Sequence, residues 1–233
     1  MTGSRSESRY AAFLREHGLL VGGALLVHRI LSRISESCGL YWYRFYRQPL
    51  VAIDSPARSS GTLEFVWLDQ YHDILGQLPR PEHNIRLRFE QQVKCLLACK
   101  QQELVACAWF GFGEFEEDEA RCTYLLPSSA VWDFDVFVFP KYRIGRIFLK
   151  TWQQANDALG REGYRYTLSR ISAYNRRSIL SHEKLGAEKV GAALFLKLGS
   201  VQLMVANLAP WVSLSWSAAS APRIDFSAVV DDA

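Results

Sequence analysis

Two clusters of basic side chains stand at the expected starts of two helices in the second half of the chain. Their members are Lys141, Arg143 and Arg146 in the first cluster, and Arg176 and Arg177 in the second. The first-turn N–H groups of a helix are unpaired and lie at the positive end of its dipole, so an exposed cation there costs about 0.3 to 1 kcal/mol. The fold could accept that cost without any ligand if the arginines simply extend into water. Two successive clusters instead favour an anionic ligand, most simply a phosphorylated one, bound by amides and guanidinium groups together.

An alternation of strands and helices must position these clusters, and hydrophobic spacing predicts it. The predicted elements are a strand at 131–139, a helix at 144–159 closed by Gly160 or Gly163, a strand at 164–171, and a helix from the capping residue Asn175 to Leu185. Strands connected through a helix in this way predict a right-handed parallel crossover. Earlier strands at 62–68, 104–112 and 122–126 follow one another like hairpins, with an acidic loop at 114–119. The predicted fold class is therefore α/β, with a mixed central sheet and flanking helices.

The N-terminal part of the chain carries the excess positive charge. Residues 1–50 hold seven arginines against three glutamates, in a chain of 233 residues with a net charge of +3. We expect residues 1–17 to be loose and residues 19–34 to form an amphipathic helix, weakened by Gly22 and Gly23. That helix either folds onto its own domain or serves as a membrane-surface anchor or partner helix. The predicted division is a basic helical extension (1–60), an α/β domain (61–218) and a C-terminal tail (219–233).

Composition limits the class of protein further. Five cysteines, an odd number without paired C-x-x-C spacing, predict reduced and mostly buried thiols in a cytoplasmic protein, with no metal site. The apolar run at 18–27 is too short for a spanning helix, and the uncharged stretch 198–222 is interrupted by Pro210, so strands near the domain edge are predicted there. We expect no nucleic-acid partner.

Nucleotide-binding and nucleophile motifs do not account for the basic clusters. Neither G-x-x-x-x-G-K-S/T nor G-x-G-x-x-G occurs, and no serine has the glycine-flanked setting of a nucleophile elbow. However, the stretches VFPKYRIGRIFL (138–149) and AYNRRSILSHEKLGAEKVG (173–191) resemble the GNAT superfamily of acyl-CoA-dependent N-acyltransferases. The similarity covers about residues 131–191. It implies that a strand ends in a turn whose amides hold the pyrophosphate of coenzyme A.

The resemblance implies a set of cofactor-binding residues in two stretches. They are Phe137, Val138, Arg143, Ile144, Gly145, Arg146, Ile147, Phe148, Asn175 and Arg176. The turn departs from the family pattern because Gly145 is its one glycine, and counting from Arg143 places Arg146 where the family has glycine. Arg146 would then replace amide contacts with charge, or the site is degenerate.

The resemblance also implies the catalytic roles. His182 stands seven residues after Asn175, where the family often has a tyrosine, and its neutral N–H would protonate the departing thiolate. Asp133 and Asp135 lie two apart on a strand and so are expected on one face, where Asp135 either accepts the amine proton through water or simply bonds to backbone or arginine.

The function implied is transfer of an acetyl or other acyl group from acetyl-CoA, or another acyl-CoA, to an amine by direct attack in a ternary complex. The acceptor would be a small-molecule amine, such as an amino sugar. Two alternatives stay open: a non-catalytic module that binds coenzyme A or phosphate, and a membrane-docking or partner-docking protein that works through residues 19–34. A homodimer is also left open.

Overall fold

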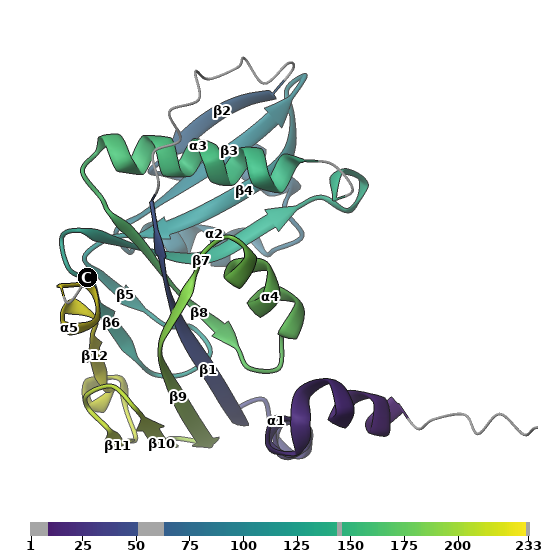
Figure 1. Ribbon diagram of the computed structural model, residues 1–233, viewed down its shortest axis with the longest axis vertical. Coiled ribbons are helices and arrows are strands. Elements are labelled where there is room, and N and C mark those ends of the chain that lie inside the picture. Colours follow the sequence, from purple (N-terminus) through teal and green to yellow (C-terminus); the bar gives the residue numbers. More distant parts are fainter. Residues whose placement is uncertain (1–8, 51–62, 144–145, 232–233) are drawn as a thin grey trace, which may run out of the picture. The chain divides into compact units, whose positions relative to one another are not determined.

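The computed structural model describes residues 9–50, 63–143 and 146–231, without the side chains of residues 9–17 and 231. The chain forms two compact units (Figure 1). Unit 1 comprises residues 1–46, 117–122 and 171–224, and unit 2 comprises residues 47–116, 123–170 and 225–233. The predicted boundary between the helical extension (1–60) and the α/β domain (61–218) lies outside the described residues.

Unit 2 is built on a mixed sheet. Its strands, in spatial order, are β8 (Tyr166–Ser172), β7 (Ala130–Val138), β4 (Glu103–Gly111), β3 (Val93–Lys100) and β2 (Leu63–Leu68). β7 and β8 are parallel, whereas β7, β4, β3 and β2 pair antiparallel. β8 extends two residues past the end of this unit. The predicted parallel crossover and the mixed α/β class are both confirmed.

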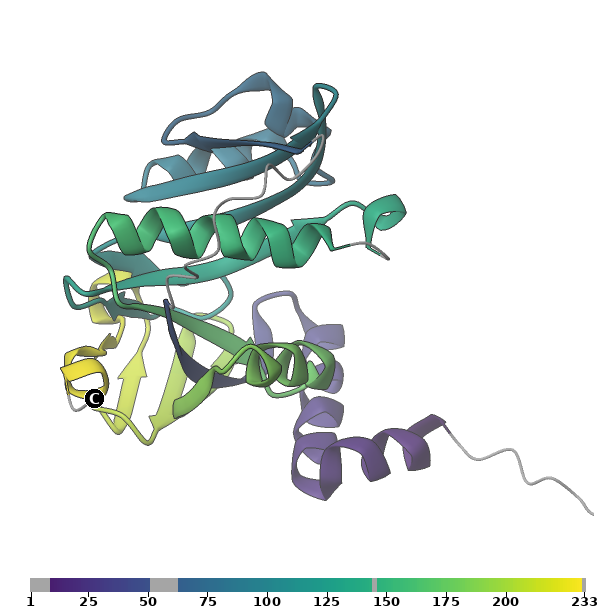
Figure 2. The same cartoon turned by 45° about the horizontal axis from the view of Figure 1, so that its top comes forward.

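The helices of unit 2 cover both faces of this sheet. They are η1 (Asp73–Gln77), α2 (Glu82–Phe89), η2 (Pro140–Tyr142) and α3 (Ile147–Arg161). Figures 1 and 2 show α3 lying across β3 and β4. It buries Trp152, Ala155 and Leu159 at the spacing that the sequence predicted, and Gly163, with φ 95°, closes its C-terminal end.

The C-terminal residues of unit 2 pack into a cluster of aromatic side chains. The elements are β5 (Glu114–Glu116), β6 (Thr123–Leu125) and α5 (Ser227–Asp231), and of β12 (Arg223–Asp225) the last residue belongs to this unit. Phe226 is fully buried, with its ring 5.9 Å from that of Tyr124 and 5.6 Å from that of Trp132. The acidic loop predicted at 114–119 is partly wrong. Glu114–Glu116 pair as a strand because Phe115 between them is buried, 4.5 Å from the ring of Phe134.

Unit 1 combines an N-terminal helix with antiparallel strands. Its elements are α1 (Arg9–Ile34), β1 (Cys38–Pro49), α4 (Arg176–Lys184), β9 (Glu188–Leu198), β10 (Val201–Ala206), β11 (Val212–Ser215) and η3 (Ala218–Ser220). The strand order is β11, β10, β9, β1, and β1 extends three residues past the end of the unit. The strands predicted near residues 201–216 are confirmed, and β11 lies at the edge.

Helix α1 confirms the predicted amphipathic segment and extends it. Residues 9–17 are helical rather than loose, and a break at Gly18, with φ 79°, separates them from the rest of α1. Val21 is buried, whereas Leu19 and Leu20 are about four-fifths exposed. The helix therefore both packs within its own unit and leaves apolar side chains in solvent. Within the described residues, no helix is long and apolar enough to cross a bilayer.

Candidate functional site

One edge of β7 is left without a strand partner over half its length. β8 pairs with β7 only from Ala130 to Asp133, and the last pair joins Asp133 to Ser169. β7 continues to Val138 along β4 alone. Backbone groups on that side of residues 134–138 are therefore available to something other than a strand.

The hydrogen-bonding pattern identifies which backbone groups face the open edge. The Phe139 N–H donates to the carbonyl oxygen of Val105 in β4 at 3.1 Å, so Phe139 and Val105 form a hydrogen-bonded pair of the ladder. Bonded and non-bonded pairs alternate along an antiparallel ladder, so the N–H and C=O groups of Val136 and Val138 point away from β4. The Val138 carbonyl oxygen accepts a bond from Nε of Arg143 at 3.0 Å. The amide and carbonyl of Val136 stay on the open edge.

A β-bulge sits beside this open edge. Trp109 of β4 lies opposite Asp135, but the next residue, Phe110, lies opposite Asp133, so Phe134 is an extra residue in β7. Opposed residues share a face of the sheet, and Trp109 and Phe110 are on opposite faces. The prediction that Asp133 and Asp135 share a face is therefore wrong, because the bulge reverses the alternation between them.

Asp135 is held by two arginines that sequence reasoning missed. Its Oδ2 accepts from Arg80 and from Arg88, each at 2.7 Å. The Arg88 guanidinium also lies over the rings of Trp109 and Phe134, at 5.0 and 5.3 Å from their centroids. The side chains of Arg88 and Asp135 are only 15% and 16% exposed, whereas that of Arg80 is 36% exposed. Asp135 is therefore bonded to arginine, which is the second of the two roles predicted for it from the sequence. Its role as a base stays a prediction.

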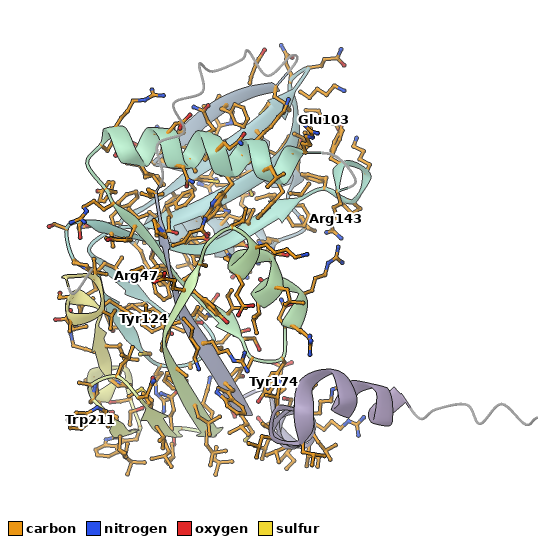
Figure 3. All side chains as sticks on the ribbon, in the orientation of Figure 1. Arg47, Glu103, Tyr124, Arg143, Tyr174 and Trp211 are labelled. Atoms are coloured by element: carbon orange, nitrogen blue, oxygen red, sulfur yellow. The ribbon has the colours of Figure 1, made fainter. Side chains whose placement is uncertain are left out.

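The turn after β7 is anchored to β4 by one carboxylate. Glu103 accepts a hydrogen bond from Lys141 and another from the Tyr142 hydroxyl at 2.9 Å. The hydrogen bond from Lys141 is the largest cause that lowers the pKa of Glu103, and the bond from Tyr142 is the next largest. The bond to Glu103 in turn raises the pKa of Lys141. Figure 3 shows Glu103 and Arg143 at this end of the sheet. Lys141, predicted to meet an anion, is thus paired within the protein.

Helix α3 begins without a side-chain cap or an acidic residue in its first turn. Arg146 is at the N-cap position, and the first bond of the helix runs from the Lys150 N–H to the Arg146 carbonyl at 2.9 Å. The amides of Ile147, Phe148 and Leu149 precede that bond and are unpaired by the helix. The side chain of Arg146 is exposed, and it does not cap the helix through a hydrogen bond. Ile144 and Gly145, both predicted to bind cofactor, lie outside the described residues.

In unit 1, α4 begins as predicted. The Asn175 side chain accepts from the Ser178 N–H at 3.1 Å, which confirms it as the cap. Arg176 is exposed, and it lines a cavity of about 180 Å³ together with Arg44 and Glu183. The acidic residue that would ordinarily complement a helix start is absent from the first turn of α4.

His182 has one ring nitrogen already engaged. Nδ1 lies 2.9 Å from the Ser178 carbonyl oxygen. A carbonyl oxygen can only accept, so Nδ1 carries the hydrogen, and Nε2 of the neutral ring is the nitrogen without one. The predicted use of the neutral ring as a proton donor therefore does not fit this geometry. In the neutral form Nε2 can accept a proton, and it can donate one only after it has accepted it.

The predicted site residues thus fall into two groups. Phe137, Val138, Arg143, Arg146, Ile147, Phe148 and Asp135 belong to unit 2, and Asn175, Arg176 and His182 belong to unit 1. Phe137 and Phe139 contact each other edge to face at 5.1 Å, and Arg143 lies over Phe137 at 5.9 Å. Within the described residues there is no group of three or more His, Cys, Asp or Glu side chains that could hold a metal ion. All five cysteines are free thiols, and all but Cys38 are buried, as predicted.

Together these features define a mixed α/β fold in which an open strand edge leads through a short turn into an uncapped helix. Solved structures with some likeness to the chain include an aminoglycoside acetyltransferase from an uncultured soil metagenomic sample, with 10% identity, a TM-score of 0.39, and coverage of 54% of this chain and 88% of that one. A protein described as a GNAT-family acetyltransferase from Novosphingobium aromaticivorans has 15% identity and a TM-score of 0.41, covering 66% of this chain and 61% of that one. An aminoglycoside N-acetyltransferase crystallised with CoA has 17% identity and a TM-score of 0.41, covering 55% of this chain and 91% of that one. No family model matches the chain, and no curated protein matches it.

Proposed function

We propose that this protein is an N-acyltransferase that moves an acetyl or other acyl group from coenzyme A to the amine of a small molecule. The observation that carries the proposal is the open edge of β7, which leads into the uncapped start of α3. An extended thioester arm can bond to the Val136 amide and carbonyl as a neighbouring strand would. A diphosphate can then accept from the first-turn amides of α3 and from Arg146.

The proposed donor site uses the residues that the family resemblance implies. The backbone of Phe137 and Val138 would lie along the thioester arm, and Arg143, Arg146, Ile147 and Phe148 would lie around the diphosphate. Arg143 is already bonded to the Val138 carbonyl, so we assign it to holding the turn and Arg146 to the direct charge contact. Asn175 and Arg176 keep the cofactor-binding role that the family resemblance implies.

The reaction we propose is direct attack in a ternary complex. The amine nitrogen forms a bond to the acyl carbon, the carbon–sulfur bond breaks, and one proton must pass from nitrogen to sulfur. His182 suits this transfer because Nε2 is an acceptor in the neutral ring. Nε2 would accept the amine proton first and then donate it to the thiolate. A backbone N–H on the open edge would stabilise the negative charge that develops on the carbonyl oxygen.

Charge near the bulge bears on the choice of acceptor. Asp135 is paired with both Arg80 and Arg88, so these three side chains carry a net charge of +1. A polycationic amino sugar would be repelled there, whereas an amine that also bears a carboxylate could pair with Arg80, the more exposed arginine. We therefore infer an acceptor with an anionic group in preference to an aminoglycoside.

Thiol release from acetyl-CoA tests the proposal. The panel would pair each amine with a close analogue that carries a carboxylate, and calorimetric titration would measure CoA binding separately. We expect turnover with at least one carboxylate-bearing amine and little with aminoglycosides. Binding without turnover across a broad panel would instead favour the non-catalytic CoA module, which the arginine at a family glycine position also supports. No binding of CoA would refute both.

A further inference from the structure

The outer strands of unit 1 have an inverted burial pattern. In β10 the apolar side chains of Val201, Leu203 and Val205 are exposed, whereas Gln202 and Met204 between them are 1% and 0% exposed. In β11, Val212 and Leu214 are exposed, and Ser215 is buried. A strand with one solvated face ordinarily directs its apolar residues to the core. Here the alternation directs five apolar side chains outward and directs Met204 to the core.

Polar contacts on the inner face fix this orientation. The Gln202 side chain donates to the Arg121 carbonyl at 2.7 Å and accepts from the Arg121 N–H at 2.8 Å. The Arg121 guanidinium donates to the carbonyl oxygens of Ser200 at 2.6 Å and Ser215 at 3.1 Å. A slip of one residue would turn the apolar side chains inward but would break this set of bonds. The outward apolar face is therefore specified by the fold.

The outward side chains form one continuous surface, which we call the β9–β11 face. Cross-strand neighbours join Leu198 to Val201, Leu196 to Leu203 and Leu214, and Leu194 to Val205 and Val212. Trp216 extends the alternation of β11, and it is exposed. Every one of these positions is apolar, so these residues carry no charge. Figure 1 shows the three strands side by side, and Trp211, also exposed, lies at the same end of the unit in Figure 3.

The exposed apolar area of this face is as large as the largest apolar patch that a monomer usually leaves in water. Its exposed members are between 36% and 70% accessible when Trp211 is included. For side chains that offer about 100 to 250 Å² each, those fractions amount to several hundred Å² of apolar surface. Monomers rarely expose a patch larger than a few hundred Å², and a standard interface covers about 800 Å² on each partner.

We propose that the β9–β11 face is the interface of a homodimer, in which it packs against the same face of a second copy. Two observations favour this occupant over a membrane or a charged partner. The face has no cationic side chain to attract anionic headgroups, and its uniform apolar surface is complementary to itself, as a two-fold interface requires.

Sedimentation analysis of the full chain over a range of concentrations tests this proposal. We expect the wild type to reach about twice its 26.5 kDa mass at micromolar concentration. The double variant Val205→Lys, Leu214→Lys should weaken the dimer at least tenfold, because each lysine would be desolvated against an apolar partner. A matched control is Val66→Lys on β2, since Val66 is 46% exposed and Val205 is 47% exposed. The control should dimerise like the wild type.

Other outcomes would overturn the proposal. A wild type that stays monomeric at high concentration would refute it whether or not the variant folds. If the monomer instead sediments with neutral phosphatidylcholine vesicles and the double variant does not, the occupant is a lipid surface. If the double variant keeps its far-ultraviolet circular dichroism and still dimerises like the wild type, the dimer uses another surface.

Discussion

Removal of Arg146 should change stability and ligand affinity in opposite directions. In the free protein an exposed cation at the N-cap of α3 opposes the helix dipole by about 0.3 to 1 kcal/mol. Arg146→Ala should therefore raise the melting temperature by about 1 to 3 °C. With CoA bound, the same guanidinium would donate a charge-assisted bond worth about 1.5 to 3 kcal/mol when well buried. Arg146 is exposed, so we discount this to about 1.4 kcal/mol, which is a tenfold weaker Kd.

A matched control lies at the other end of the same helix. Arg161 is exposed in the last turn of α3, where a cation favours the dipole. Arg161→Ala should lower the melting temperature slightly and leave the Kd for CoA unchanged. Calorimetric titration and differential scanning fluorimetry measure the two effects, and the affinity difference for Arg146→Ala should shrink at high salt because exposed charges are screened. If Arg146→Ala gains stability and keeps its affinity for CoA, the arginine is a tolerated surface charge and the phosphate argument fails.

Three further predictions follow from other contacts. His182→Ala should lower kcat by about a hundredfold with CoA affinity kept within twofold, because His182 is proposed to carry the proton from nitrogen to sulfur; a kcat that stays at the wild-type value would remove His182 from the proposed reaction. Glu103→Gln should destabilise the protein at neutral pH, because the Lys141 bond lowers the pKa of Glu103 in the folded state. The difference in stability between the variant and the wild type should disappear as the pH falls below 4.5, the ordinary pKa of this carboxyl group. A stability difference that persists in acid would contradict the prediction. Phe226→Ala should lower the free energy of unfolding by about 3 to 5 kcal/mol and the melting temperature by roughly 10 °C, since the ring is fully buried against Tyr124 and Trp132. A loss of less than about 1 kcal/mol would mean that residues 219–233 act only as a tail.

Several features of the candidate site were readable from the sequence because they depend on neighbours along the chain. Asn175 caps α4 through a bond to Ser178, three residues away. The apolar spacing of α3 reflects the helical period, and Pro140 and Gly163 mark the ends of β7 and α3. The cations beside the two helix starts were likewise visible as residues in the wrong place for the dipole.

The chemistry of individual side chains was harder to predict because their partners are distant in sequence. Lys141 belongs to the predicted anion-binding cluster, yet Glu103 neutralises it across a separation of 38 residues. Arg88 reaches Asp135 across 47 residues. No local pattern links these positions, so the sequence could name Asp135 as a candidate without giving its charge environment.

The sequence by itself determined the order of β7, α3, β8 and α4, the Asn175 cap and the parallel crossover, because hydrophobic period and capping bonds act within a few residues. Only the tertiary structure decided that a bulge at Phe134 turns Asp133 and Asp135 to opposite faces, and that β10 and β11 present their apolar residues to solvent. Both depend on pairing register, and a single residue of register reverses the side on which every following side chain lies.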